Sequence, residues 1–335
     1  MFSSIKERAA GIFPGFIISL TVGLAASFLG EHYGAPAMLF ALLLGMALHF
    51  LHEDPKCQPG IAFTGTTILR IGVALLGLRI ALSDVMALGW ETFALMTAGV
   101  ALTILFGLII ARLFGLKHRF GALTGGAVAI CGASAALAIS AIMPKNASQE
   151  RDTVFAVVGV TALSTLAMII YPMIGTVLGL SETQAGVFIG ATIHDVAQVV
   201  GAGYSISTEA GDLATLTKLM RVALLLPVVL IFVMVFRATC GAEMGTGKKP
   251  PLLPGFLVAF VLLVALNSFV SIPVELKASL TTVSRTCLIT AIAAIGLKSN
   301  LKSIATLGWR PILLMVAETV WLAALVLLCL PYVVN

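Results

Sequence analysis

The chain has 335 residues, of which 59% are hydrophobic and only 10% are charged, and its mean hydropathy is +1.09. Soluble domains contain roughly 45–50% apolar residues, so this composition indicates a multi-pass membrane protein and excludes an ordinary soluble domain. The net charge of +5 does not indicate a nucleic-acid partner, because the basic residues lie at the ends of apolar segments, where they set orientation in the lipid bilayer.

Apolar segments of about 20 residues, the length that crosses a bilayer, alternate with short charged turns. Alternating strand patterns are absent, so we expect an all-α polytopic fold of about 11 transmembrane helices. The expected spans are 12–30, 36–51, 61–80, 88–113, 119–143, 153–180, 184–204, 212–237, 254–270, 278–299 and 308–333. An N-terminus on the cytoplasmic side leaves only Arg79, Lys145, Arg151 and Lys277 in the outer loops, which fits the positive-inside rule.

Two stretches of the chain repeat each other. Ala74–Trp90 and Ala293–Trp309 match without gaps at seven positions, and the segments that begin at Pro14 and Pro254 open in the same way. An odd number of crossings separates the two long stretches, so they are expected to run in opposite directions. Inverted repeats are typical of secondary transporters, which bind substrate near the midplane of the membrane where helices break.

A first break is expected between Gly121 and Ala138, where fourteen of eighteen residues are Gly, Ala, Ser, Thr or Cys. Such a segment unwinds easily, and its freed backbone groups then serve as ligands if they line a cavity. Cys131, Gly132 and Ser134 are the candidate substrate-binding residues here. The alternative is a continuous helix with tight small-residue packing.

A second break is expected in the segment from Gly186 onward, where His194 and Gln198 share one helical face with glycines. Ionisable groups in hydrocarbon cost at least a few kcal/mol each, so they usually have a partner, a water-filled cavity or a function. We expect Gln198 to bind substrate and His194 or Asp195 to carry the coupling ion. The alternative is a histidine that only packs.

Lys218 and Arg221 are three residues apart and therefore neighbours on one helical face. Two cations repel unless an anion lies beside them, and the planar fork of arginine suits oxyanions. We therefore expect both to bind an anionic substrate. The alternative is a later helix start, which would let both side chains reach the membrane surface.

Three further charged residues lie within apolar spans. Arg285 and Arg70 stand among hydroxyl residues, and Arg285 is a further candidate for substrate binding. Glu318 is a carboxyl group at bilayer depth, where such a group is able to carry a proton, so it joins Asp195 as a coupling candidate. A structural pair between Glu318 and a buried arginine is the alternative.

The sequence does not indicate an enzyme. It contains no H-E-x-x-H, no G-x-S-x-G and no paired intramembrane aspartates, and it has no nucleotide-binding P-loop. Its five cysteines are scattered singly, so no metal site or other cofactor is expected.

Four motifs resemble one known family. They are LRIGVALLGLRIAL (69–82), AICGASAALAI (129–139), IHDVAQVVGAG (193–203) and KLMRV (218–222). The chain resembles the YeiH-type family of bacterial inner-membrane proteins, which are generally described as sulfate exporters. The resemblance implies membership of the cation:proton antiporter and anion transporter superfamily, in which a scaffold domain supports a core domain of crossed, broken helices.

On that basis the core is expected to contain 119–237 and 278–333, and the scaffold 12–51 and 254–270. One feature departs from the superfamily: the second break comes early, and the spans 119–143 and 184–204 run parallel, which simple inverted symmetry does not allow. Either one of these segments is a re-entrant hairpin or the count of spans is wrong by one.

The sequence therefore predicts a secondary active transporter of a small anion, such as sulfate or a sulfonate, coupled to H⁺ or Na⁺. The alternatives are a Na⁺/H⁺ antiporter and a passive anion channel. A homodimer is left open.

Overall fold

The computed structural model describes residues 2–33, 37–143, 147–240, 255–270, 272–299 and 309–334. Every regular element in these ranges is helical, which confirms the all-α prediction. The helices are α1 (Phe2–Tyr33), α2 (Ala37–Ala47), η1 (His49–His52), α3 (Gln58–Phe63), η2 (Thr64–Ile68), α4 (Leu69–Leu76), α5 (Leu82–Ala87), α6 (Gly89–Leu113), α7 (His118–Ala129), α8 (Ala133–Ile142), α9 (Ala147–Val177), α10 (Glu182–Thr192), α11 (Val196–Tyr204), α12 (Thr208–Ala223), α13 (Leu225–Cys240), α14 (Gly255–Phe269), α15 (Val274–Lys298) and α16 (Trp309–Val333).

Seven helical stretches within the described ranges are long and apolar enough to cross a membrane. They are Ala10–Tyr33, Gln58–Leu76, Gly89–Leu113, Arg151–Val177, Thr208–Phe236, Val274–Lys298 and Trp309–Val333. Each corresponds to one of the eleven expected spans. The expected spans 36–51, 119–143, 184–204 and 254–270 contain shorter helices instead. The multi-pass prediction is supported, and the count of eleven is not.

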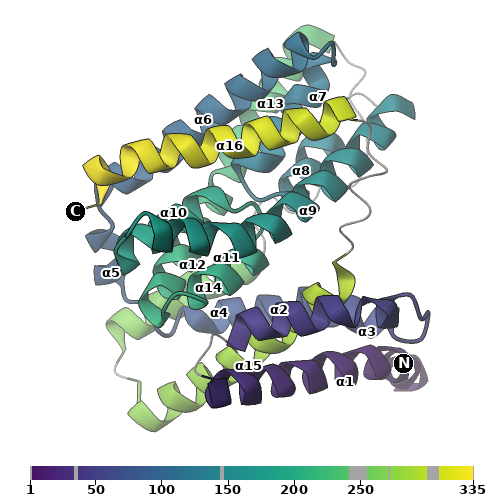
Figure 1. The fold of residues 1–335 in the computed structure, drawn as a ribbon, viewed down its shortest axis with the longest axis vertical. Helices are drawn as coiled ribbons and strands as arrows, with labels where there is room; N and C mark the ends of the chain where they lie inside the picture. The colour runs from purple at the N-terminus through teal and green to yellow at the C-terminus, as the bar shows by residue number, and fades with distance from the viewer. Residues whose placement is uncertain are drawn as a thin grey trace.

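The helices form two packed groups (Figure 1). Block A consists of α1 to α4, α14 and α15, and α15 packs against α1, α2 and α4. Block B consists of α6 to α13 and α16. The two blocks meet where α11 packs against α2 and α15. The amino and carboxyl ends lie at opposite sides of the molecule (Figure 1), and we call these sides the N face and the C face.

Helices α7 and α8 form a re-entrant hairpin. Gly126 in α7 packs so closely on Ile139 in α8 that a methyl group at Gly126 would collide with it, whereas thirteen residues of continuous helix would separate them by about 20 Å. The chain reverses at Gly132, whose φ of 63° is a conformation that favours glycine. The predicted break between Gly121 and Ala138 is confirmed, and the continuous-helix alternative is wrong.

Helices α10 and α11 form a second hairpin. Gly186 in α10 and Gly203 in α11 both pack against Ala210, at the beginning of α12, so the two ends of the hairpin lie together. The entry is fixed by a capping box in which Ser181 accepts a hydrogen bond from the amide of Gln184 and the Gln184 side chain accepts one from the amide of Ser181, both at 3.2 Å.

The two hairpins enter from opposite faces. The first opens at the N face, where Phe120 of α7 packs with Leu314 near the beginning of α16. The second opens at the C face, where the side-chain amide of Gln184 donates to the carbonyl of Val334, just beyond α16, at 3.2 Å. The segments 119–143 and 184–204 therefore turn back instead of crossing. This explains why counting them as parallel spans conflicted with inverted symmetry.

Two helix pairs run antiparallel. Along α15, Gly65 of η2 lies against Ile295 and Gly72 of α4 lies against Leu288. Along α6 and α16, Gly99 lies against Leu322 and Phe106 stacks on Trp321, with ring centroids 4.7 Å apart. Helices α4 and α6 flank the first repeated stretch, 74–90, and α15 and α16 flank the second, 293–309. Most of the second copy, residues 300–308, lies outside the described residues.

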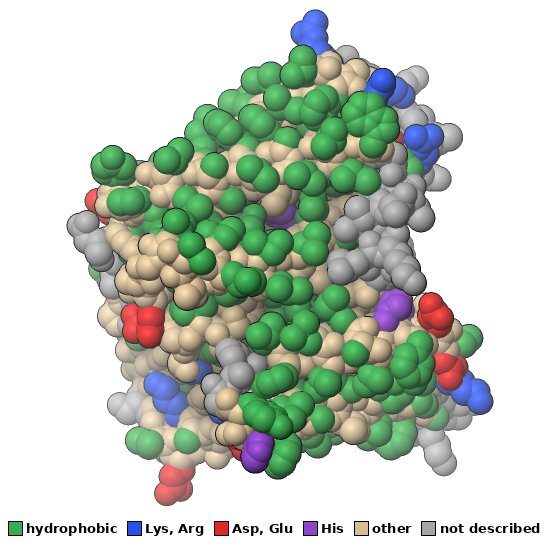
Figure 2. Space-filling model, viewed as in Figure 1, with side chains coloured by type: hydrophobic (Ala, Val, Ile, Leu, Met, Phe, Trp, Pro, Cys, Tyr) green, Lys and Arg blue, Asp and Glu red, His purple; other side chains and the backbone are tan. Residues whose placement is uncertain are grey.

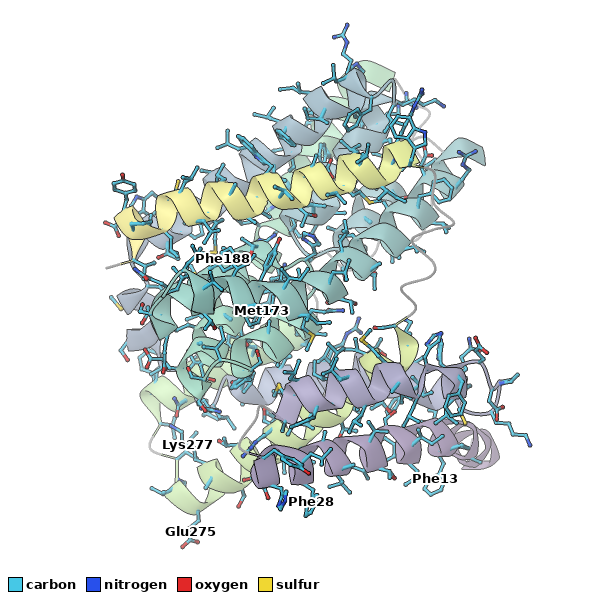
Figure 3. The ribbon with its side chains drawn as sticks, in the orientation of Figure 1. Phe13, Phe28, Met173, Phe188, Glu275 and Lys277 are labelled. Carbon is cyan, nitrogen blue, oxygen red and sulfur yellow. The ribbon has the colours of Figure 1, made fainter. Side chains whose placement is uncertain are left out.

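The surface fits a bilayer. Hydrophobic side chains cover the face in Figure 2, and charged side chains gather at its edges. Phe13 and Phe28 of α1 are 61% and 67% exposed and point outward (Figure 3). Exposed aromatic and aliphatic side chains on this scale are what a lipid-facing surface requires.

Because the backbones of α2 and α15 lie in close contact, adding a single methyl group at Gly45 is expected to lower the thermal stability of the protein. An alanine Cβ at Gly45 would lie 2.9 Å from Cα of Gly296 and would collide with the carbonyl of Ala293. Backbone atoms cannot move aside as a flexible side chain does, so Gly45→Ala is expected to lower the melting temperature in detergent by several degrees. Gly11→Ala is the control, because nothing lies within 4 Å of that position. Equal melting temperatures for the two variants would contradict this packing.

Candidate functional site

The tips of the two hairpins meet inside block B. The first tip is the turn Ile130–Gly132, and the second is Ile193–Asp195. A Cβ at Gly132 would lie 3.5 Å from Cβ of His194, so the two turns lie side by side with room for no more than a small side chain between them. Four helix ends therefore converge at one buried point.

Lys218 joins the two tips. Its side chain is fully buried, and Nζ donates to the carbonyl of Ile130 in the first tip at 2.6 Å and to that of Ile193 in the second at 2.8 Å. An ammonium has three N–H donors, so one donor remains beyond these two bonds.

Arg221 lies one turn further along α12 and is 1% exposed. Nε and Nη2 donate to Ala129, Nη2 also donates to Val128, and Nη1 donates to Gly190 and Ile193. These five bonds equal the five N–H donors of a guanidinium.

The carbonyls that these cations bind end helices α7 and α10. The last turn of a helix leaves carbonyls without intrahelical partners and carries partial negative charge, so buried cations stabilise it. Both side chains begin on α12, which starts ten residues before Lys218. The alternative in which they reach the membrane surface is wrong.

Three buried polar atoms around the second hairpin have no hydrogen-bond partner among the described residues. They are Nδ1 of His194, Oε1 of Gln198 and Oγ1 of Thr217. A buried polar atom without a partner costs about 1–3 kcal/mol, so such atoms usually bind water or a ligand. The second tip and the neighbouring helices α11 and α12 therefore offer unused polar groups as well as the cations.

Asp195 begins α11 beside the cations. Its backbone amide donates to Oγ of Ser164 at 3.1 Å, which ties the second tip to α9. Its carboxylate interacts electrostatically with Lys218. His194 and Asp195 both belong to the second tip, so two of the predicted coupling residues lie beside the charge at the tips.

A polar chain connects α16 to both hairpins. Oε1 of Glu318 accepts from Oγ1 of Thr124 in α7 at 2.8 Å, and Oε2 has no partner among the described residues. The next residue, Thr319, donates to the carbonyl of Met315, so its oxygen accepts from Nε2 of His194 at 3.0 Å. Glu318 forms no ion pair with an arginine among the described residues, so the predicted alternative of an arginine pair is not found there.

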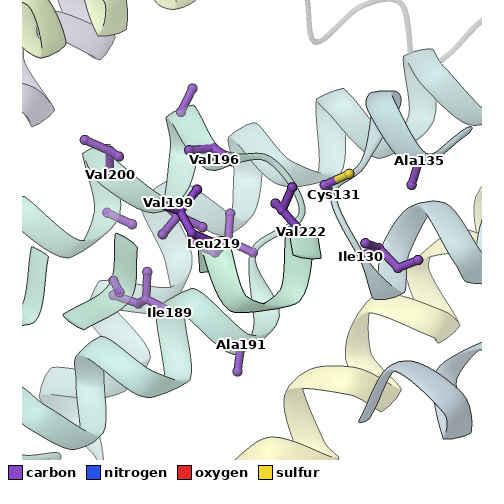
Figure 4. Close-up of a cluster of buried hydrophobic side chains, with 14 of the residues drawn as sticks. Ile130, Cys131, Ala135, Ile189, Ala191, Val196, Val199, Val200, Leu219 and Val222 are labelled. Atoms are coloured by element: carbon purple, nitrogen blue, oxygen red, sulfur yellow. The ribbon is translucent and has the colours of Figure 1, made fainter. Parts of the chain in front are cut away.

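Apolar side chains enclose the tips. Val196 and Val199 from α11 face Leu219 and Val222 from α12, and Ile130 lies at the first tip (Figure 4). All five are less than 9% exposed. This shell excludes water from the cations and strengthens their bonds to the carbonyls.

Of the other residues singled out in the sequence, some lie at the tips and others lie elsewhere. Cys131 and Gly132 lie buried at the first tip, whereas Ser134 is exposed in the first turn of α8. Arg285 is exposed and lines a cavity on the C face, away from the tips. Arg70 is exposed, with its guanidinium 6.0 Å from the ring centre of Phe256. The structure therefore does not bring Arg285 or Arg70 to Lys218 and Arg221.

Sequence reasoning missed three contacts of this site. Ser164, Thr124 and Thr319 are hydroxyl residues in otherwise apolar helices, and each binds a tip residue or Glu318. Hydroxyls are common in membrane helices because they also bond to their own backbone, so their presence alone gave no signal.

Comparisons with known proteins agree on one family. The family model described as conserved hypothetical protein 698 matches residues 14–315. The UPF0324 membrane protein TauZ of Paracoccus denitrificans is 54% identical, over 94% of this chain and 93% of its own length. A UPF0324 membrane protein of Chlorobaculum tepidum is 52% identical, over 96% and 90%. The inner membrane protein YeiH of Escherichia coli K12 is 30% identical, over 86% and 83%.

Among solved structures, the sodium proton antiporter MjNhaP1 of Methanocaldococcus jannaschii matches 94% of this chain and 97% of its own, with 14% identity and a TM-score of 0.31. At that TM-score the two folds are not shown to be alike. The family model and the relatives, in contrast, extend over almost the whole length, so this chain belongs to the YeiH-type UPF0324 family of membrane proteins.

Proposed function

We propose that this protein is a secondary active transporter that moves a small anion, such as sulfate or a sulfonate, across the bacterial inner membrane with H⁺ or Na⁺. The observation that carries the proposal is the meeting of two opposed re-entrant hairpins at Lys218 and Arg221. Non-helical backbone at membrane depth is tolerated where it is buried or lines a path, and transporters use such breaks to bind substrates and ions.

The direction of the helices at the tips favours an anion. The C-terminal ends of α7 and α10 are already neutralised by the two cations, whereas α8 and α11 begin at the same point. A helix N-terminus presents free amides and partial positive charge. Asp195 occupies the beginning of α11, so the beginning of α8, with Ser134, is the place for the anion.

The residues then take different roles. Arg221 has no donor left and is proposed as a positioning residue that holds both tips. The remaining donor of Lys218, with Cys131, Gly132, Ser134 and Gln198, is proposed to contact the anion. Asp195, His194 and Glu318 are proposed to carry the coupling ion.

Block B is proposed to move against block A during transport. The packing of α15 with α1 and α2 favours placing α15 in the scaffold, although sequence reasoning placed it in the core. The antiparallel pairs α4 with α15 and α6 with α16 support inverted repeats. The first hairpin also returns the beginning of α9, with Arg151, to the N face near Lys117, which strengthens the charge bias for a cytoplasmic N-terminus.

Sulfate flux in proteoliposomes tests the proposal. Wild type is expected to show uptake that rises with an imposed pH or sodium gradient. Lys218→Gln is expected to lower this uptake at least tenfold, while Lys56→Gln, an exposed lysine in a turn, leaves it unchanged. Gln198→Leu removes an oxygen that has no partner among the described residues and is expected to lower uptake in a protein that still folds.

Three results would contradict the proposal. Uptake that does not respond to either gradient indicates a passive channel. Sodium-dependent proton movement without flux of sulfate, methanesulfonate or a carboxylate indicates a Na⁺/H⁺ antiporter. Sulfate uptake at the wild-type rate in both Gln198→Leu and Lys218→Gln would show that the anion does not pass the tips.

A further inference from the structure

A polar cavity lies on the C face, between the two blocks. Its volume is about 520 Å³, and it is formed by the beginning of α2, the end of α4, α15 and the turn from α11 to α12. Its polar lining residues are Arg79, Tyr204, Thr208, Lys277, Thr281, Thr282 and Arg285. The lining thus combines three cations with four hydroxyl groups and contains no carboxylate.

The positive charge of this cavity is only partly balanced. Nη2 of Arg79 pairs with Oδ2 of Asp212 at 2.9 Å, and the hydroxyl of Tyr204 donates to the same carboxylate. Lys277 donates to the neutral side chain of Asn267 at 2.9 Å. The described part of the chain holds no ion pair for Arg285. Two of the three cations therefore lack a carboxylate partner.

These two cations are arranged to act together. Lys277, Thr281 and Arg285 are spaced by four residues along α15 and so share one helical face. Lys277 lies near the beginning of α15 (Figure 3), and Arg285 is about 12 Å deeper along the helix. Both side chains are long and flexible, so they are able to converge on one ion in the cavity. A structural role would instead place a counter-charge between them.

We propose that this cavity binds a doubly charged tetrahedral oxyanion between Lys277 and Arg285. Two uncompensated cations match a dianion better than a monoanion, and the guanidinium fork of Arg285 matches the edge of a tetrahedral oxyanion. Block A supplies α15, and block B lines the cavity with Tyr204 and Thr208, so the bound anion lies between the two blocks. The role of the cavity as an entrance rests on the proposed transport function, whereas binding itself does not.

Direct binding to the purified full-length protein tests this site. Radiolabelled sulfate is measured on nanodiscs of neutral lipid at constant ionic strength, with methanesulfonate as the monoanionic competitor. Lys277→Gln/Arg285→Gln is expected to weaken sulfate binding at least tenfold, and Arg70→Gln, an exposed arginine on α4 outside this cavity, is expected to leave it unchanged. Sulfate is expected to bind more tightly than methanesulfonate in wild type.

Several outcomes would overturn the site. One is unchanged sulfate affinity in the double variant, and another is equal affinity for sulfate and methanesulfonate. A third is loss of sulfate binding when anionic phospholipid is added to the nanodiscs, because this would assign the cavity to a lipid phosphate. Sulfate binding that depends on both cations, in a protein without flux, keeps the site and removes the transport function. If the wild type shows flux and the double variant binds sulfate as tightly as wild type, the transport function is kept and the cavity is removed as a binding site.

Discussion

Replacing Arg221 with glutamine is expected to lower the melting temperature of the detergent-solubilised protein by on the order of 10 °C. The guanidinium makes five hydrogen bonds to carbonyls of both hairpins. Removing one partner from a buried charged network costs about 3–5 kcal/mol, because the remaining groups lose their only counterpart. Glutamine offers two donors on a shorter chain, so it cannot reach both hairpins.

Two variants control for this effect. Arg70→Gln removes an exposed guanidinium that lies over Phe256 and is expected to change the melting temperature little. Arg221→Lys retains the charge but not the planar fork, and is expected to recover only part of the loss. A melting temperature for Arg221→Gln within about two degrees of wild type would mean that the carbonyls do not depend on this residue.

Glu318→Gln is expected to separate transport from its coupling. Glutamine keeps the size of the side chain and an oxygen that accepts from Thr124, so the packing around Gly107 and Thr124 is retained. It cannot gain or lose a proton. Uptake driven by a pH gradient is therefore expected to fall at least tenfold, while exchange of sulfate for sulfate at equal pH continues at a rate close to that of wild type.

The comparison of the two assays in the same proteoliposomes gives the readout. Glu275→Gln is the control, because Glu275 is exposed at the beginning of α15 and points away from the protein (Figure 3). If Glu318→Gln loses both kinds of flux together with thermal stability, Glu318 is a structural residue. If it keeps uptake driven by the pH gradient, the proton is carried elsewhere.

The positions of the helix breaks can be predicted from the sequence, because they depend on local chemistry. A glycine at 132 and a polar His194–Asp195 pair weaken a helix wherever it packs. The direction of the chain after each break was not readable. It depends on Lys218 and Arg221, which bind the first tip and the end of α7 from 88 to 93 residues away. No local pattern encodes a partner at that distance.

The sequence predicts the roles of the charged residues only in part. The burial of Lys218 and Arg221 followed from their place in an apolar segment, but the sequence does not tell whether a buried cation binds a ligand or a carbonyl. The sequence indicates Arg285 as a candidate, whereas it places Lys277 only in an outer loop. Their shared cavity arises from the packing of α15 on the α11–α12 turn, which is a tertiary contact.

The long-range bonds at the first tip set an order of events during biosynthesis. The carbonyls of Val128, Ala129 and Ile130 receive their donors from residues that the ribosome adds 88 to 93 positions later, after about 5–20 s of translation. Until then these carbonyls have no partner, and burying them in lipid would cost several kcal/mol each. The first hairpin is therefore expected to stay outside the hydrocarbon until α12 arrives, so nascent chains truncated before Lys218 should leave it accessible to water-soluble reagents.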